Sequence, residues 1–204
     1  MILCHGTESF NRHLSSMKPF LEEYYKMGIS LFLFDFTGYG ESGGKGEFNH
    51  SQRVADISSV LERFKHKYKK IVLCGISLGT ISAAIAATKY KEITGLYLVN
   101  GYYDLLLTYP RFYLQTLLGY FLNQEIRIET IYAWKHLRPE RIKIPTLIVA
   151  GAKDQIVNPK QSINFYNKLA CEKKLIIAPD GVHALTDQRY IQEFLPEVKQ
   201  WILQ

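Results

Sequence analysis

The sequence predicts an α/β fold in which a mostly parallel sheet of six strands carries helices on both of its faces. Two observations predict this architecture. Short, continuously apolar runs alternate along the chain with longer segments whose apolar residues recur at helical spacing, which is typical of a doubly wound sheet. Strands that are apolar at every position must also be covered on both faces, which favours parallel pairing. The 204 residues suit a single domain, 1–204, with a substantial core.

Each element is expected from its own local pattern. Residues 14–27 carry apolar side chains at helical spacing, and a second helix with this pattern begins near Ser51. Asn158-Pro159 predicts a helix start, because proline is favoured at the first helical position. A closing helix is expected from about 186 to 203, and Pro196 should kink or divide it. The six strands are expected at 1–4, 29–36, 71–74, 95–100, 145–150 and 175–178.

A Gly-x-Ser-x-Gly motif stands between the third strand and an alanine-rich segment. In Gly75-Ile76-Ser77-Leu78-Gly79 the glycines remove side chains that would collide with the neighbouring strand and helix, and Ser77 is expected at the apex of a sharp turn. Such a turn exposes the hydroxyl at a helix N-terminus, where an anionic intermediate is favoured. The motif alone also arises by chance, so it indicates a catalytic serine only if an acid and a histidine are expected near it.

Polar residues that follow the strands supply those partners. Ligands of such sheets bind beyond the carboxyl ends of the strands. A serine hydroxyl needs a base to remove its proton, and the imidazolium then formed needs a carboxylate beside it. Ser77, Asp154 and His183 would meet at one edge in these roles. The residues at the strand ends are His5-Gly6-Thr7, Asp35, Ser77, Asn100, Asp154 and His183.

Composition and charge argue against several other classes of protein. No apolar run approaches the ~20 residues of a membrane span, and the first residues lack the pattern of a signal peptide. We therefore expect a cytoplasmic protein without stable membrane insertion. Much of the net charge of +6 lies in Lys65-His66-Lys67-Tyr68-Lys69-Lys70. This run enters the end of the Ser77 strand that is remote from the hydroxyl, so we expect a solvated loop rather than a nucleic-acid site.

The cysteines and histidines show no metal-binding spacing. Cys4 and Cys74 lie in apolar strands, where buried thiols are expected. No CxxC or HExxH pattern occurs. We therefore expect neither a metal nor an organic cofactor.

Taken together, these motifs resemble the α/β-hydrolase superfamily, and within it the serine esterases and acyl hydrolases of the cinnamoyl-esterase-like and monoacylglycerol-lipase-like branches. The resemblance covers nearly the whole chain. It implies a short helical lid inserted at about 102–140. The matching segments are Cys4-His5-Gly6-Thr7, Asp35-Phe36-Thr37-Gly38-Tyr39-Gly40-Glu41-Ser42, Gly75-Ile76-Ser77-Leu78-Gly79, Gly151-Ala152-Lys153-Asp154 and Asp180-Gly181-Val182-His183.

The resemblance also implies a role for each matching residue. Ser77 would be the nucleophile, His183 the general base and acid, and Asp154 the carboxylate that orients His183. The backbone N–H groups of Thr7 and Leu78 would form the oxyanion hole. Asp104, just after the fourth strand, is the rival acid, since Asp154 could merely cap the helix that follows it. His5 and Asp35 are expected to order their loops.

Members of the superfamily normally have two further strands before the one that ends at His5, and the sequence starts at that strand. The implied sheet then begins with the strand that precedes Asp35, followed by the strands at 1–4, 71–74, 95–100, 145–150 and 175–178 in that order. Residues 31–34 would form an exposed apolar edge. We expect reduced stability, a homodimer that covers this edge, or N-terminal residues lost from the stated sequence.

The lid segment is rich in aromatic residues, most of which should pack within the lid while some line an acyl or aryl pocket. Its arginines would form a solvated face or attract a carboxylate or phosphate. These expectations favour a serine hydrolase that cleaves small-molecule carboxylic esters; the alternatives are a thioesterase, a lysophospholipase or a binding pseudoenzyme. The residues concerned are Tyr102, Tyr103, Tyr109, Phe112, Tyr113, Tyr120, Phe121, Tyr132 and Trp134, with Arg111, Arg127, Arg138 and Arg141.

Overall fold

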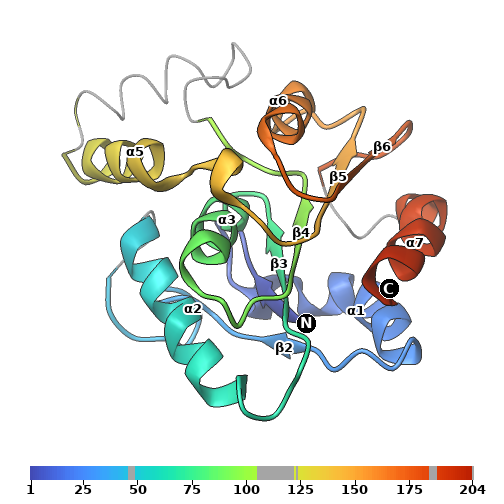
Figure 1. Ribbon diagram of the computed structural model, residues 1–204, viewed down its shortest axis with the longest axis horizontal. Helices are drawn as coiled ribbons and strands as arrows, with labels where there is room; N and C mark the ends of the chain where they lie inside the picture. Colours follow the sequence, from blue (N-terminus) through green and yellow to red (C-terminus); the bar gives the residue numbers. More distant parts are fainter. Residues whose placement is uncertain (46–48, 105–121, 123, 184–187, 204) are drawn as a thin grey trace.

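The protein is built on a six-stranded parallel sheet with the strand order β2-β1-β3-β4-β5-β6 (Figure 1). The computed structural model describes residues 1–45, 49–104, 122, 124–183 and 188–203. Both the number of strands and their spatial order confirm the prediction. The strands are β1 (Ile2–Cys4), β2 (Phe32–Leu33), β3 (Val72–Ile76), β4 (Gly95–Val99), β5 (Thr146–Gly151) and β6 (Lys173–Ala178).

Helices cover both faces of this sheet. Helices α1 (Phe10–Lys26) and α7 (Gln188–Leu203) pack against one face, where Tyr97 and Val99 of β4 lie. Helices α2 (His50–Phe64), α3 (Gly79–Lys89) and α6 (Lys160–Lys168) pack against the other, where Leu96 and Leu98 lie. Alternate residues of β4 therefore enter two separate cores, which is why this strand carries no charged residue.

Several boundaries differ from the predicted ones. The second strand is only Phe32–Leu33, because its partner β1 pairs with it over two residues. Helix α1 begins at Phe10, ahead of the expected residue 14. Helix α2 begins at His50, because the Asn49 side chain accepts a hydrogen bond from the Gln52 N–H and caps it. Helix α7 continues through Pro196, so of the two predicted alternatives, a kink or a division, division of the helix is wrong.

The apolar edge formed by residues 31–34 is less exposed than expected. Strand β2 does lie at the edge of the sheet. Its side chains are half-buried, because Leu31 and Leu33 pack against the α1 side while Phe32 and Phe34 pack against the α2 side. The Phe32 ring lies 4.6 Å from the Phe64 ring of α2. Covering both faces of this strand removes most of the expected side-chain exposure.

The described part of residues 102–140, for which a lid was expected, contains α5 (Gln124–His136) and a short 3-10 helix, η1 (Pro139–Arg141). Helix α5 packs beside α2 (Figure 1), and the Glu129 carboxylate accepts a 2.6 Å hydrogen bond from the His50 N–H. Arg127, Arg138 and Arg141 are exposed. Tyr109, Arg111, Phe112, Tyr113, Tyr120 and Phe121 lie outside the described residues.

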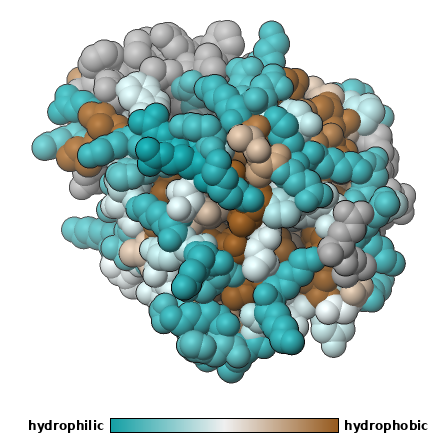
Figure 2. All heavy atoms as spheres, in the orientation of Figure 1, coloured by the Kyte–Doolittle hydropathy of each residue, from teal (hydrophilic) through white to brown (hydrophobic). Residues whose placement is uncertain are grey.

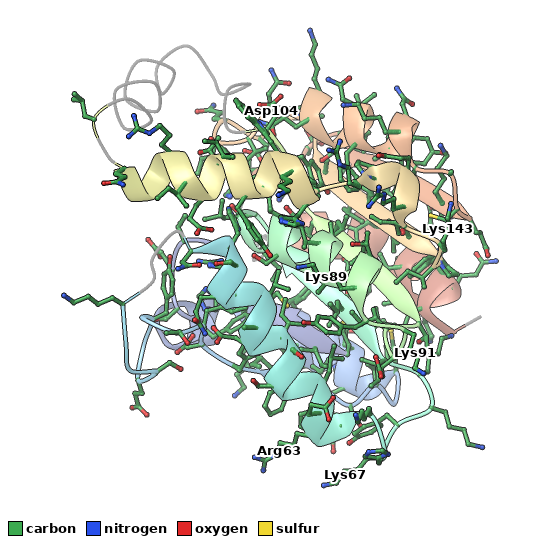
Figure 3. All side chains as sticks on the ribbon, turned by 60° about the vertical axis from the view of Figure 1, so that its left-hand side comes forward. Arg63, Lys67, Lys89, Lys91, Asp104 and Lys143 are labelled. Atoms are coloured by element: carbon green, nitrogen blue, oxygen red, sulfur yellow. The ribbon has the colours of Figure 1, made fainter. Side chains whose placement is uncertain are left out.

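The surface is mainly hydrophilic on the face shown in Figure 2, with hydrophobic residues at the side where α5 lies. Ile128, Ile131 and Trp134 of that helix are exposed apolar residues. Arg63 and Lys67 project outward at the end of α2 (Figure 3), and residues 66–70 are exposed as expected for a solvated loop. No helix in the described ranges is long and apolar enough to cross a membrane.

Candidate active site

Ser77 lies in the turn between β3 and α3, where the backbone is strained. Its φ of 52° is in the left-handed region, which side chains other than glycine seldom adopt. A Cβ atom on Gly79 would overlap the carbonyl oxygen of Cys4, and one on Gly75 would lie 2.7 Å from the Cα of Thr80. Gly75 therefore allows α3 to approach β3, and Gly79 allows the start of α3 to approach the end of β1.

His183 bridges Ser77 and Asp154. Its Nε2 atom lies 3.1 Å from the Ser77 hydroxyl oxygen, and its Nδ1 atom lies 2.7 Å from Oδ2 of Asp154. A carboxylate can only accept, so Nδ1 carries the proton and the Nε2 lone pair faces the hydroxyl. The three side chains thus form one hydrogen-bonded chain, although 106 residues separate Ser77 from His183.

Asp154 is held rigidly beneath this histidine. Its side chain is 2% exposed. Its second oxygen, Oδ1, accepts hydrogen bonds of 2.8 Å from the N–H groups of both Ile156 and Val157. These bonds orient the carboxylate and leave Oδ2 for His183, so the same residue organises its own loop and the imidazole.

Asp104 occupies a different position. Its backbone N–H donates to Oε1 of Gln161 at 2.9 Å, next to the equivalent bond from Tyr103. The hydrogen bond that His183 makes through Nδ1 goes to Asp154. The geometry therefore places Asp154, and not Asp104, in the chain that reaches Ser77.

The loop after β1 lies directly against the nucleophile. A Cβ atom on Gly6 would lie 3.0 Å from the Cβ of Ser77 and 3.4 Å from its hydroxyl oxygen. Within the described chain, neither the Thr7 nor the Leu78 N–H donates a hydrogen bond to a protein acceptor. Thr7 directly follows Gly6 in this loop, and Leu78 directly follows Ser77.

His5 orders this loop as a neutral imidazole. Its Nε2 atom accepts a 3.0 Å hydrogen bond from the Phe36 N–H, and its Nδ1 atom lies 3.1 Å from the Gly6 carbonyl oxygen. Burial, followed by the nearby charge of Arg53, lowers the pKa of His5 to about 4. Asp35 holds the next segment, because its carboxylate accepts a 2.7 Å hydrogen bond from the Phe10 N–H.

Asn100 contacts the candidate site, although no role was expected for it from its place at a strand end. It follows β4 with φ 46°, a conformation that asparagine tolerates. Its Nδ2 donates to the carbonyl oxygens of Val182 and His183, while its Oδ1 accepts from the Gly151 N–H. It therefore links the end of β5, which precedes Asp154, to the loop that carries His183. Its place at a strand end was the only signal for it in the sequence.

Within the described chain, the cysteine and acidic side chains form no metal-binding site in addition to the candidate active site. Cys4 and Cys74 are buried, and burial raises the pKa of the Cys4 thiol to about 12. No group of three or more histidine, cysteine, aspartate or glutamate side chains among the residues described is arranged to hold a metal ion.

Comparisons with known proteins agree with this architecture. The family model described as "Serine aminopeptidase, S33" matches residues 1–128 and 128–189. Among curated proteins, a Saccharomyces cerevisiae protein described as an uncharacterized membrane protein, YNL320W, is 29% identical over 188 residues. That match covers 90% of this chain and 63% of the relative, so the chain spans less than two thirds of this relative's length.

Two solved structures share the fold. The monoacylglycerol lipase of Paleococcus ferrophilus superposes with a TM-score of 0.76 at 20% identity, covering 99% of this chain and 93% of the lipase. The Pyrococcus furiosus esterase Pf2001 superposes with a TM-score of 0.75 at 23% identity, covering 99% of this chain and 81% of the esterase. At these identities the likeness is one of fold.

Proposed function

The chain belongs to the serine aminopeptidase S33 family of α/β hydrolases, and from this premise we propose that it is a serine hydrolase that cleaves carboxylic esters of acyl or aryl acids. The observation that carries the proposal is the hydrogen-bonded chain from Asp154 through His183 to Ser77. Such a chain turns a weak nucleophile into a reactive one, because the proton of the hydroxyl has a base to receive it.

Acylation begins at the Ser77 hydroxyl. Its proton passes to Nε2 of His183 while its oxygen attacks the ester carbonyl carbon, and Asp154 stabilises the imidazolium. The carbonyl oxygen becomes an oxyanion, which accepts hydrogen bonds from the N–H groups of Thr7 and Leu78. The intermediate then collapses, the bond to the alcohol oxygen breaks, and His183 returns the proton to the leaving alcohol.

Deacylation repeats the sequence with water. His183 takes a proton from the water molecule as it attacks the acyl-enzyme, and the same N–H groups stabilise the second oxyanion. Collapse of this intermediate releases the carboxylic acid and returns the proton to Ser77. Over the whole cycle the ester and one water molecule are consumed, the alcohol and the carboxylic acid are released, and the groups of this chain return to their starting state.

The ester substrate is supported by the names of the structural relatives, which are a lipase and an esterase. The family description also names an aminopeptidase, and the same triad could cleave a peptide bond. The amine that leaves from an amide is a poorer leaving group than an alcohol, so its nitrogen must be protonated as the C–N bond breaks. A substrate panel therefore has to compare the two bond types directly.

The test is covalent labelling with a fluorophosphonate probe, followed by kinetics. We expect labelling of the wild type and of Ser59→Ala, an exposed serine on α2, and no labelling of Ser77→Ala. In kinetics, p-nitrophenyl esters of increasing chain length should be hydrolysed faster than acyl-CoA thioesters and amino-acid p-nitroanilides. If the folded wild type remained unlabelled, the proposal that the protein is a serine hydrolase would be wrong. If it cleaved the anilides faster than the esters, the proposal that its substrate is an ester would be wrong.

A further inference from the structure

Arg53 is a buried arginine whose guanidinium reaches the loop beside the nucleophile. It lies in the first turn of α2, and 1% of its surface is exposed. Its Nη1 donates to the His5 carbonyl oxygen at 3.1 Å, and its Nη2 donates to the Gly6 carbonyl oxygen at 2.9 Å. One side chain therefore holds two consecutive carbonyl groups of the segment that precedes Thr7.

The Gly6 carbonyl is held from two directions. Because the Phe36 N–H donates to Nε2 of His5, the proton of this neutral imidazole is on Nδ1, which lies 3.1 Å from the Gly6 carbonyl oxygen. The same oxygen accepts the bond from Arg53. Two donors thus determine the orientation of this carbonyl group.

Orientation of the Gly6 carbonyl also sets the orientation of the Thr7 N–H. Both groups belong to one planar peptide unit, in which C=O and N–H point in opposite directions. A carbonyl directed toward Arg53 therefore directs the Thr7 N–H away from it. Gly6 itself lies against the Ser77 side chain, so this peptide unit is next to the nucleophile.

We propose that Arg53 is a positioning residue for catalysis, which acts through the Gly6–Thr7 peptide to align the Thr7 N–H of the oxyanion hole. This inference rests on the proposed function of Ser77. The Arg53 side chain does not touch the reacting atoms; it stabilises one orientation of a backbone donor whose alignment is needed only when the oxyanion forms.

The surroundings of Arg53 suit an arginine rather than a lysine. Its guanidinium carbon lies 4.7 Å from the centre of the Phe36 ring and 4.9 Å from that of Tyr39. A planar guanidinium can stack between rings and still direct two N–H groups at neighbouring carbonyl oxygens, whereas an ammonium is a compact point charge. Lysine at this position would therefore keep the charge without the paired donation.

The test compares Arg53→Met with Arg63→Met, which removes an exposed arginine from the same helix (Figure 3). Turnover of p-nitrophenyl butyrate is expressed per site titrated with a fluorophosphonate, so that loss of folded protein does not affect the result. Removing an oxyanion donor lowers kcat by about 10²–10³, and misalignment should cost about tenfold or more. We expect this loss in kcat with KM unchanged, together with weaker inhibition by a trifluoromethyl ketone, which forms an anionic adduct.

Arg53→Lys keeps the charge and much of the volume, so it provides a second variant if methionine prevents folding. We expect its kcat to be lower than that of the wild type but higher than that of Arg53→Met. A value of kcat per titrated site within about twofold of the Arg63→Met control, in a folded Arg53 variant, would overturn the proposal.

A failure of the proposed function gives a different result. In that case the wild type itself neither reacts with the fluorophosphonate nor hydrolyses the ester. The positioning role can then be tested through the backbone amide resonances of Gly6 and Thr7 in ¹H–¹⁵N spectra. We expect them to shift in Arg53→Met and not in Arg63→Met, and unchanged resonances in the Arg53 variant would overturn the positioning role independently of turnover.

Discussion

The side-chain amide of Asn100 donates a 2.8 Å hydrogen bond to the backbone carbonyl of His183. The same amide group donates to the Val182 carbonyl, and its oxygen accepts from the Gly151 N–H. A residue at the end of β4 therefore sets the distance between the loop that carries the candidate base and the strand end that precedes the candidate acid.

Replacing Asn100 should disturb this alignment without unfolding the protein. Asn100→Gly removes the side chain while permitting the positive φ. A displacement of His183 by ~1 Å would lower kcat by about 10²-fold. Steady-state kinetics beside a melting curve measures both effects. Asn100→Asp, which can accept from Gly151 but cannot donate to the two carbonyls, should be impaired as well. Wild-type turnover in both variants would show that the link is dispensable.

Asp154→Asn should abolish most activity and leave the loop intact. The asparagine oxygen can still accept from the N–H groups of Ile156 and Val157, but its amide nitrogen would face His183 and favour the wrong tautomer. We expect kcat to fall by about 10⁴-fold. Asp104→Asn is the matched comparison and should retain nearly full kcat. A larger loss of kcat in Asp104→Asn than in Asp154→Asn would show that Asp104 is the acid.

Gly79→Ala should destabilise the fold, because an added Cβ would overlap the carbonyl oxygens of Cys4 and His5. Neither backbone group can move aside as a flexible side chain could. Overpacking of this kind costs about 1–3 kcal/mol or more, which urea unfolding can measure. The control is Gly43→Ala, since a Cβ there has no neighbour within 4 Å. Equal unfolding free energies for the two variants would contradict the steric account.

Two buried histidines should make the protein less stable in mild acid. Burial, followed by the charge of Arg53, lowers the pKa of His5 to about 4 and that of His50 to about 3. The unfolded chain, with pKa values of about 6.5, then binds protons that the folded protein excludes. This contribution to stability is complete above about pH 6.5 and is lost as the pH falls toward 4.

Between about pH 7 and about pH 5, the free energy of unfolding should fall by roughly 2 kcal/mol for each of these histidines. The double variant His5→Gln/His50→Gln should show a smaller decline than the wild type in urea titrations at the two pH values. His66→Gln, which replaces an exposed histidine, should decline as the wild type does. Parallel declines in all three proteins would exclude this linkage.

Local patterns in the sequence were sufficient for most of the fold. Apolar runs located all six strands, and the glycine spacing around Ser77 indicated the strand-turn-helix connection. These features depend on neighbouring residues, so short segments carry the information. The length of β2 was overestimated, because the apolar residues 29–36 do not reveal that β1 offers a pairing partner for only two of them.

The sequence by itself determined which residues end the strands at one edge of the sheet, and hence the candidates Ser77, Asp154 and His183. Tertiary structure decided which of these residues make contact, that His183 bonds Asp154, and that Asn100 and Arg53 hold the loops around them. The physical reason is distance along the chain. Arg53 contacts a carbonyl 48 residues away and Asn100 one that is 83 residues away, and such contacts depend on how helices and loops pack rather than on any local pattern.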